Sequence, residues 1–410
     1  MNDRYGAATP RAASSYAAVS FDEACERARS LVPVLRERAT ACEAARALPR
    51  ETIADLDASG LMRILQPRRW GGMALDFHAI VEIADILAQG CASTSWVFAN
   101  IAIHHWMLAL YDEAAQAEIW GANPDAYIAS GIAYPQGRAT RVAGGLSLSG
   151  HWNFSSGVGC SGWNMLACVV RDDAGRPIDH VMTVVPASDY EIVDDWQVMG
   201  LSGTGSMSVR CEGVFVPEHR ALSMARGRAG GPADFPGLRT NPEPLYRIPF
   251  GGLAAHCILG TTLGNAQAML DAIVAMVRER STSYTGLSMR DLGTVQLRVG
   301  TASAKLEAAR LMAREDCVQA QRLAERGELP DLEARLKQKR NCAFAMALAT
   351  ECVDTLYALA GANGLYTRGA IERIWRNQHA AAGHINFSVD AQASAWALAA
   401  LGGEVRNPTL

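Results

Sequence analysis

The chain has 410 residues, of which 49% are hydrophobic and 20% are charged, and its formal net charge is −4. This length exceeds what one hydrophobic core serves, so the composition predicts a globular protein of two or three domains. The small net charge and the lack of a Lys/Arg cluster argue against nucleic acid or an anionic membrane as a partner.

The cysteines and histidines follow no metal-binding pattern. The ten cysteines include no C-x-x-C pair, and we expect reduced, mostly buried thiols in a cytoplasmic protein. None of the nine histidines follows a Glu by three residues, so the di-iron pattern is missing and no metal is predicted. We also expect no segment long and apolar enough to cross a membrane. A protein of this composition that handles oxygen needs an organic cofactor.

The first part of the chain is predicted to be a disordered tail followed by a helical domain. Residues 1–20 are rich in Ala and Ser and lack an apolar h-region, which is typical of a tail. Over residues 21–125, apolar residues recur at three- and four-residue spacing, which predicts helices. Trp96 and His104 lie eight residues apart on one such helix, so they share a face. A histidine there also fits simple packing with one satisfied hydrogen bond.

The middle of the chain is predicted to be a β domain. Over residues 126–224 the hydrophobic period changes to two, and Asp172–Gly175 separates two apolar runs as a hairpin turn does. Gly150–Gly157 and Trp196–Ser206 are rich in glycine and hydroxyl residues, which let a flat polar ligand approach closely. Gly157–Gly162 matches the G-x-G-x-x-G dinucleotide pattern, but a strand follows it instead of a helix, so we predict no Rossmann site.

The last part of the chain is predicted to be helical. Residues 225–248 are rich in Gly, Pro and Arg and are expected to form a linker or surface loop. Residues 249–410 contain two long periodic runs, the second capped by Asp331 and reaching about Ala360. A run of 30 residues is about 45 Å long, enough for a bundle that also packs between subunits.

Three segments carry a resemblance to a known family. Gly150–Gly157, Trp196–Ser206 and Val214–Arg220, in this order, resemble the middle domain of the acyl-CoA dehydrogenase fold. The Phe-Ser-Ser-Gly ending of the first resembles its oxygenase branch, the two-component flavin-dependent monooxygenases of the p-hydroxyphenylacetate hydroxylase type. The resemblance spans about residues 21–402. It implies a multi-domain α+β protein with an N-terminal helical domain, a middle β-barrel and a C-terminal four-helix bundle, assembled as a homotetramer.

The resemblance also implies a flavin site. One hydroxyl of Ser155 and Ser156 matches the group that meets the flavin N5 edge, and a one-residue register leaves open which serine faces inward. Without the resemblance, the interpretation of both serines as turn residues is the favoured one. Further matches to flavin-lining positions are Thr204, Ser206, Arg247 and either Arg278 or Arg280, the last two in the region that meets the flavin phosphate.

Catalytic and substrate positions follow from the same resemblance. Trp96 and His104 match residues that line the substrate pocket, where the histidine is placed to take a phenol proton, and Ser130 matches a nearby pocket hydroxyl. His384 matches a histidine beside the flavin where oxygen reacts. Asn377 stands where relatives often have Asp, so we predict no paired carboxylate there.

Two chemistries run on this fold, and the acidic residues separate them. Acyl-CoA dehydrogenation needs a carboxylate base, and neither residues 380–386 nor residues 253–262 contain one. We therefore predict the oxygenase component of a two-component monooxygenase, which uses reduced FMN or FAD (FMN slightly favoured) and O₂ through a flavin C4a-hydroperoxide to hydroxylate a small phenolic or indolic substrate. A separate NAD(P)H:flavin reductase is expected because no nicotinamide-binding motif is present. The alternatives are an acyl-CoA dehydrogenase and an oxygenase of nitrogen or sulfur.

Overall fold

The structure is a computed structural model that describes residues 15–227 and 234–405. Its N-terminal part is helical, as predicted. α1 begins after Ser20, whose hydroxyl accepts a hydrogen bond from the backbone nitrogen of Glu23, and ends where Arg46 adopts a left-handed conformation. The helices are α1 (Phe21–Ala45), α2 (Arg50–Ser59), α3 (His78–Ala88), α4 (Ala92–Leu108) and α5 (Glu113–Gln116). α4 is buried on almost every face, so it is the central helix of the site described below.

The beginning of the chain corrects one expectation. Of the tail predicted over residues 1–20, residues 1–14 lie outside the described residues. From residue 15 the chain is packed: the backbone nitrogen of Tyr16 donates to the carbonyl of Gly71 at 2.8 Å, and the Arg63 guanidinium lies over the Tyr16 ring. Residues 15–20 therefore belong to the N-terminal helical part, because an aromatic side chain anchors them.

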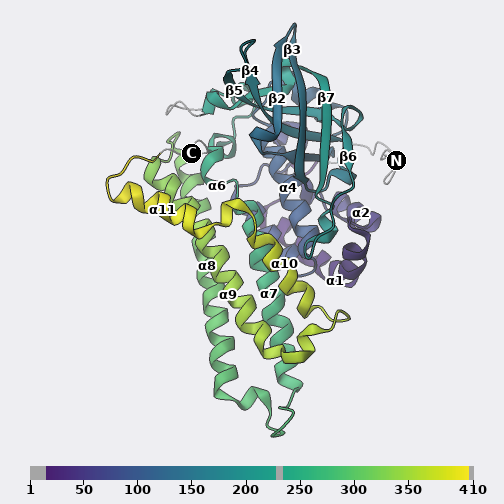
Figure 1. The fold of residues 1–410 in the computed structure, drawn as a ribbon, viewed down its shortest axis with the longest axis vertical. Helices are drawn as coiled ribbons and strands as arrows, with labels where there is room; N and C mark the ends of the chain where they lie inside the picture. The colour runs from purple at the N-terminus through teal and green to yellow at the C-terminus, as the bar shows by residue number, and fades with distance from the viewer. Residues whose placement is uncertain (1–14, 228–233, 406–410) are drawn as a thin grey trace.

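The middle of the chain forms one mixed sheet of eight strands, above the bundle in Figure 1. The strands are β1 (Ile128–Gly131), β2 (Gly137–Val142), β3 (Gly145–Ser155), β4 (Trp163–Arg171), β5 (Pro177–Pro186), β6 (Glu191–Val193), β7 (Met207–Pro217) and β8 (Ala221–Ser223). Their order is β6-β7-β3-β2-β4-β5-β8, with β1 paired to β4. β1 and β2 run parallel to β4, and the other pairs are antiparallel. The predicted hairpin is confirmed as β4 and β5.

The segment between the sheet and the bundle is more deeply packed than the sequence predicts. Residues 228–233 of the expected 225–248 loop lie outside the described residues. Further on, Leu245 and Tyr246 are buried, and the Trp106 indole nitrogen donates to the Leu245 carbonyl at 3.0 Å. Leu245 and Tyr246 of this linker therefore do not lie on the surface, because their side chains pack into the core between α4 and the bundle.

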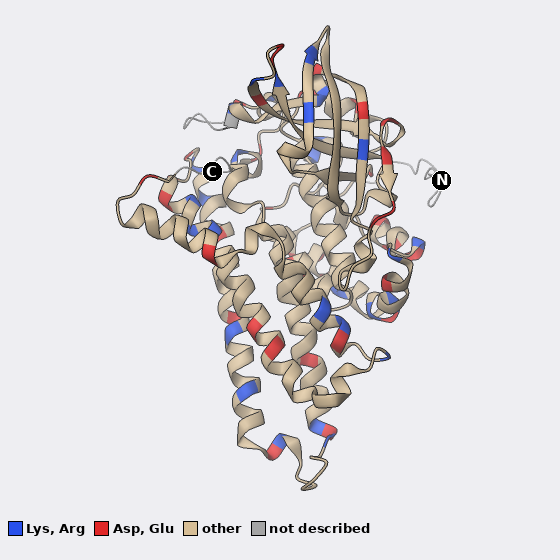
Figure 2. Cartoon of the chain, in the orientation of Figure 1, with Lys and Arg blue, Asp and Glu red and all other residues tan. Residues whose placement is uncertain are grey.

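The C-terminal part is a helical bundle. Its helices are α6 (Phe250–Leu253), α7 (His256–Glu279), α8 (Gly293–Glu325), α9 (Leu332–Ala360), α10 (Ile371–Ala382) and α11 (Val389–Ala400). The predicted cap is confirmed, because the Asp331 carboxylate accepts from the backbone nitrogen of Ala334 at 2.8 Å. α7 to α10 pack together along the long axis of the molecule, and α11 packs on α9 (Figure 1). Figure 2 shows acidic and basic residues interspersed along both the bundle and the sheet.

Two bundle helices correct the expectation about apolar segments. Phe250–Glu279 and Leu332–Leu365 are long and apolar enough to cross a membrane by length and composition. In the structure 67% and 50% of their most apolar windows are buried inside the protein. Their hydrophobicity serves the packing of α7 and α9 against neighbouring helices.

Candidate active site

The end of β3 separates the two serines that the sequence could not distinguish. The pairing of β3 with β7 shifts register between Trp152 and Ser155, and Phe154 in this bulge has a φ of 66°. Ser155 stays in the sheet, fully buried, where its hydroxyl accepts from the side-chain amide of Asn164 at 3.0 Å. Ser156 leaves the sheet towards α4. The bulge therefore gives the two adjacent hydroxyls different partners.

Ser156 joins a buried cluster of polar side chains from three segments. The Trp96 indole nitrogen, on α4, donates to the Ser156 hydroxyl at 3.2 Å. That hydroxyl lies 2.8 Å from the Ser206 hydroxyl, and the Ser206 hydroxyl lies 2.7 Å from that of Thr204. Four of the predicted site residues are thus brought into contact, although up to 110 residues separate them in the sequence.

The loop that carries Thr204 and Ser206 is held by α10. Leu201 has a left-handed φ of 54°, and its backbone nitrogen donates to the side-chain oxygen of Asn377 at 2.8 Å. A Cβ on Gly200 would come within 2.3 Å of the Arg376 carbonyl, so only glycine fits this approach. The Arg376 guanidinium also donates to the Met199 carbonyl. The sequence analysis noted Asn377 only as a departure from the family; the left-handed residue that it supports is not visible in the pattern.

His384 lies beside this cluster, directly after α10. Its ring meets that of Trp96 edge to face, with centroids 6.2 Å apart. Burial lowers the pKa of His384 to about 4, so the imidazole is neutral at physiological pH. The Nδ1 atom accepts from the backbone nitrogen of Asn386 at 3.3 Å, which places the single ring proton on Nε2.

His104 has the opposite tautomer. Its Nδ1 lies 2.6 Å from the carbonyl oxygen of Ile128, and a carbonyl only accepts, so Nδ1 carries the proton. Burial lowers the pKa of His104 to about 4, against the smaller opposing effect of this hydrogen bond. The Nε2 atom is buried and has no hydrogen-bond partner within the described part of the chain. His104 therefore presents an unshared lone pair inside the protein.

Ser130 lies on the strand that His104 contacts. Strand alternation puts the side chains of Ile128 and Ser130 on the same face of β1, and α4 packs against this strand. Ser130 is 7% exposed. A buried hydroxyl thus stands on the strand whose carbonyl fixes the His104 tautomer.

Comparisons with known proteins identify the family of this chain. Family models described as "Acyl-CoA dehydrogenase, N-terminal domain" and "Acyl-CoA dehydrogenase, C-terminal domain" match residues 25–122 and 256–389. The oxygenase subunit HsaA of a flavin-dependent monooxygenase from Rhodococcus jostii (strain RHA1) is 35% identical, over 88% of this chain and 93% of that protein. The chain belongs to the flavin-dependent monooxygenases of the acyl-CoA dehydrogenase fold.

Two further relatives support this assignment. The oxygenase component of an FADH₂-dependent resorcinol hydroxylase from Rhizobium sp. (strain MTP-10005) is 35% identical, over 89% of this chain and 90% of that protein. The crystal structure of the HsaA monooxygenase from M. tuberculosis superposes with a TM-score of 0.90 at 31% identity, and the match covers 95% of this chain and 100% of the other. The dehydrogenase alternative is accordingly set aside.

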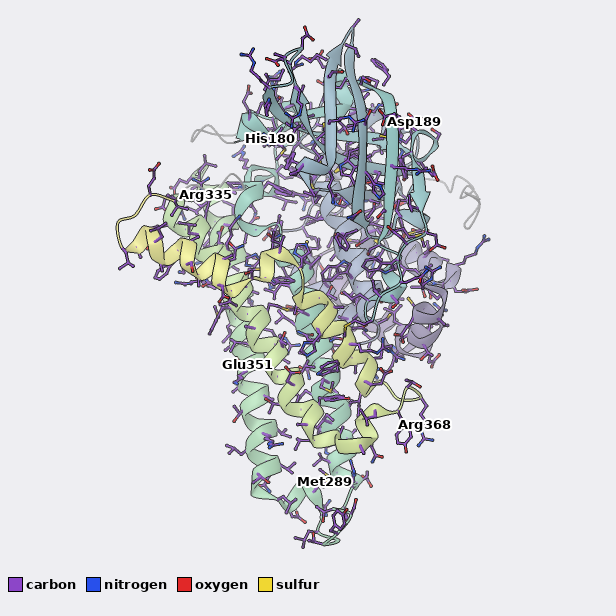
Figure 3. All side chains as sticks on the ribbon, in the orientation of Figure 1. His180, Asp189, Met289, Arg335, Glu351 and Arg368 are labelled. Carbon is purple, nitrogen blue, oxygen red and sulfur yellow. The ribbon has the colours of Figure 1, made fainter. Side chains whose placement is uncertain are left out.

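Arg278, one of the two arginines predicted to meet the flavin, does not join the cluster within this monooxygenase chain. Arg247 and Arg278 both have exposed side chains. Arg278 is on the last turn of α7, next to Arg280, whose carbonyl accepts from the backbone nitrogen of Met289. Figure 3 shows Met289 at the end of the bundle opposite to the sheet. Arg280, the alternative to Arg278, donates to the Ala360 carbonyl at 2.9 Å. Within a single chain, neither Arg278 nor Arg280 therefore lies near Ser156.

Two open hollows of the monooxygenase lie elsewhere. One has a volume of about 340 Å³ and the other of about 760 Å³; five Asp, Glu or Arg side chains line each of them, and neither includes a predicted site residue. Among the described residues, no group of three or more His, Cys, Asp or Glu is arranged to hold a metal ion. All ten cysteines are free, and eight of them are buried. The candidate site is thus the buried cluster around Trp96, Ser156 and His104.

Proposed function

We propose that this monooxygenase hydroxylates a small phenolic or indolic ring, with His104 as the base that takes the substrate proton. The observation that carries the proposal is the buried, unpartnered Nε2 lone pair of His104. With a pKa of about 4 the imidazole is unprotonated at neutral pH, and a base in this state can accept a proton as the ring is attacked. Trp96 and Ser130 are assigned to the walls of the substrate pocket.

The chemistry of the Ser156 cluster fits a flavin in its reduced form. When bound, reduced flavin supplies the electrons that activate O₂. Its N5–H is a hydrogen-bond donor, and we assign the Ser156 hydroxyl as the acceptor of this hydrogen bond. Thr204 and Ser206 support Ser156, and the neutral His384 carries its ring proton on Nε2. We assign these four residues to flavin binding, with His384 nearest the position where oxygen reacts.

Reduced FAD is the flavin that we propose, in place of the FMN slightly favoured from the sequence. The resorcinol hydroxylase relative, at 35% identity, is named for FADH₂. Titration of the protein with FAD and FMN, each reduced and kept free of oxygen, separates the two. Tighter binding of reduced FMN contradicts the choice of FAD and leaves the remaining assignments unchanged.

A separate NAD(P)H:flavin reductase is the partner that we propose. The names "oxygenase subunit" and "oxygenase component" of the relatives support it, because each is one part of a larger system. We expect the pure protein to leave NADH and NADPH unchanged and to become active when any flavin reductase supplies reduced flavin. NAD(P)H oxidation by the pure chain alone would contradict this arrangement.

We further propose that the protein is a cytoplasmic homotetramer. Leu297 and Leu311 on α8 and Phe344 on α9 have exposed fractions of 70%, 58% and 47%, which leaves apolar surface along the bundle. Packing between copies covers such a surface and gives Arg247 and Arg278 a route to the flavin phosphate of another copy. Light scattering should give a mass of about four chains, and a monomeric mass contradicts both points.

The substrate proposal is tested by turnover with reduced flavin and O₂. We expect oxygen insertion into phenols and indoles, detected by mass spectrometry of the product. A matched panel of aryl amines and aryl sulfides tests the alternative of nitrogen or sulfur oxidation. Exclusive oxidation of the heteroatom would contradict ring hydroxylation while leaving the monooxygenase assignment intact.

A further inference from the structure

Three hydroxyl groups of the site form a chain whose proton directions follow from the contacts. The hydroxyl of Thr204 lies 2.7 Å from the Leu201 carbonyl, which can only accept, so the Thr204 proton lies on this bond. Thr204 then has no proton for its 2.7 Å contact with Ser206, and it must accept there. The hydroxyl proton of Ser206 therefore points to Thr204.

The same argument fixes Ser156. Because the Ser206 proton is used, the 2.8 Å contact between Ser206 and Ser156 carries the Ser156 proton. The Trp96 indole is only a donor, so Ser156 accepts at that contact. The reverse orientation would leave two oxygens, those of Thr204 and Ser206, 2.7 Å apart with no proton between them. The Ser156 hydroxyl thus donates its one proton to Ser206 and accepts from Trp96 with one lone pair. Only its second lone pair is free to accept a further hydrogen bond.

We propose that this polarised chain of Ser156, Ser206 and Thr204 makes the site select reduced over oxidised flavin. The proposal rests on the proposed function, in which Ser156 faces the flavin N5 edge. Reduced flavin has an N5–H donor there, whereas N5 of oxidised flavin is an acceptor. A Ser156 hydroxyl with only a lone pair free accepts a hydrogen bond from the N5–H of reduced flavin. With oxidised flavin, the Ser156 oxygen faces the N5 nitrogen with no proton between the two atoms. Thr204 and Ser206 are thus positioning residues that act through Ser156.

The Thr204 end of this chain of hydroxyl groups is anchored by the protein, which keeps the hydroxyl protons in the directions deduced above. The Leu201 carbonyl also accepts from the Trp196 indole at 3.4 Å, and the left-handed backbone of Leu201 is held by Asn377. Thr204 and Ser206 are 2% and 3% exposed, so their hydroxyls are shielded from bulk water. The directions deduced from the contacts are therefore set by protein groups alone.

The test compares Thr204→Val, which removes the acceptor for Ser206 at nearly constant volume, with Thr204→Ser, which keeps the hydroxyl. Dissociation constants for oxidised flavin and for dithionite-reduced flavin without oxygen are measured by calorimetry, and their ratio is the readout.

In Thr204→Val the Ser206 proton turns to Ser156, which frees the Ser156 proton for oxidised N5. The preference for reduced flavin should fall roughly two- to twelvefold, the effect of one neutral hydrogen bond. A tenfold fall equals about 30 mV in the midpoint potential of the bound flavin. Thr204→Ser should keep the wild-type ratio.

Ser206→Ala is the second variant, because it removes the acceptor of the Ser156 proton directly and serves if Thr204→Val does not fold. An unchanged ratio in both variants, with a changed ratio in Ser156→Ala, overturns the polarised chain but leaves Ser156 at the flavin edge. An unchanged ratio in Ser156→Ala as well removes Ser156 from N5 and overturns both assignments. Failure of the wild-type protein to bind any reduced flavin overturns the proposed function itself.

Discussion

The side-chain oxygen of Asn377 lies 2.8 Å from the backbone nitrogen of Leu201, and this contact joins the bundle to the loop that carries Thr204 and Ser206. A left-handed conformation disfavours a residue with a Cβ by roughly 1–2 kcal/mol, so Leu201 needs outside support. Because α10 leads directly to His384, one helix positions both the hydroxyl chain and the histidine beside it.

Replacing Asn377 tests this support. Asn377→Ala leaves the buried Leu201 N–H without an acceptor, which should lower the free energy of unfolding by about 1–3 kcal/mol and weaken the binding of reduced flavin. Asn377→Asp is the matched control, because its carboxylate still accepts from Leu201. Urea unfolding and flavin titration give both quantities. An alanine variant as stable as the aspartate variant would remove Asn377 from this role.

The elements of the fold were largely predictable because their signals are local. The change of hydrophobic period from three or four to two separates helices from strands. Asp331 marks the start of α9, and the backbone groups that it caps lie at most four residues further along the chain. The β4–β5 hairpin likewise has its turn residues next to its strands. The buried course of Leu245 and Tyr246 was not predictable, because their partners Trp106 and Leu65 come from far earlier in the chain.

The contacts within the candidate site were not predictable from the sequence. The resemblance named Trp96, Ser156 and Thr204, yet the choice between the two serines depends on a bulge at Phe154, a one-residue shift that the alternating pattern does not encode. The hydrogen bond between Leu201 and Asn377 spans 176 residues and involves a backbone group. No side-chain pattern indicates such a contact, so its discovery required the structure.

The two serines should differ in what their loss changes. Ser156→Ala removes the acceptor proposed for the flavin edge, so we expect more hydrogen peroxide and less hydroxylated product per reduced flavin consumed. Ser155→Ala instead deprives the buried Asn164 amide of its acceptor, and we expect it to lower stability by about 1–3 kcal/mol with unchanged coupling. The product-to-peroxide ratio and urea unfolding are measured on both variants. The reverse result would assign the flavin edge to Ser155.

His104 and His384 should act at different steps. If His104 takes the substrate proton, His104→Asn slows hydroxylation of a phenol by about 10²–10⁴-fold and leaves oxygen consumption without substrate unchanged. His384→Asn should instead impair the reaction with oxygen, whether or not substrate is present. Stopped-flow measurements resolve the two steps, and a substrate without an acidic proton is the control. Equal effects of His104→Asn on both substrates contradict its role as a base.

The depressed pKa of His104 also makes a prediction about acid stability. Its pKa falls from an ordinary value of 6.5 to about 4 in the folded protein, because burial disfavours the imidazolium. Between pH 6.5 and 4 the unfolded chain therefore binds a proton that the folded protein does not, and stability falls as the pH falls. Each such histidine contributes a slope of about 1.4 kcal/mol per pH unit. His104→Asn should make the stability curve shallower in this window, as followed by urea unfolding at several pH values.

The bundle contains a buried ion pair. Its loss should lower the free energy of unfolding more than the loss of a surface ion pair. His256, at the start of α7, is fully buried, and its Nε2 lies 3.2 Å from the carboxylate of Asp316 on α8, which also accepts from Asn341. Breaking a buried pair leaves one uncompensated charge, so Asp316→Asn should lower the free energy of unfolding by about 3–5 kcal/mol. Glu351→Gln, which breaks the exposed pair with Lys305, is the control and should lower it by less than about 1 kcal/mol.

The pH dependence of the pair has a sign opposite to that of His104. Burial by itself lowers the pKa of His256, but Cys342 and Asp316 outweigh it and raise the pKa to about 10. The stability from this group is therefore complete below pH 6.5 and is lost as the pH rises towards 10. Asp316→Asn should remove this alkaline loss, whereas Glu351→Gln should retain it. If Asp316→Asn and Glu351→Gln lose equally little stability and show the same alkaline curve, the His256–Asp316 contact carries no ion pair in solution.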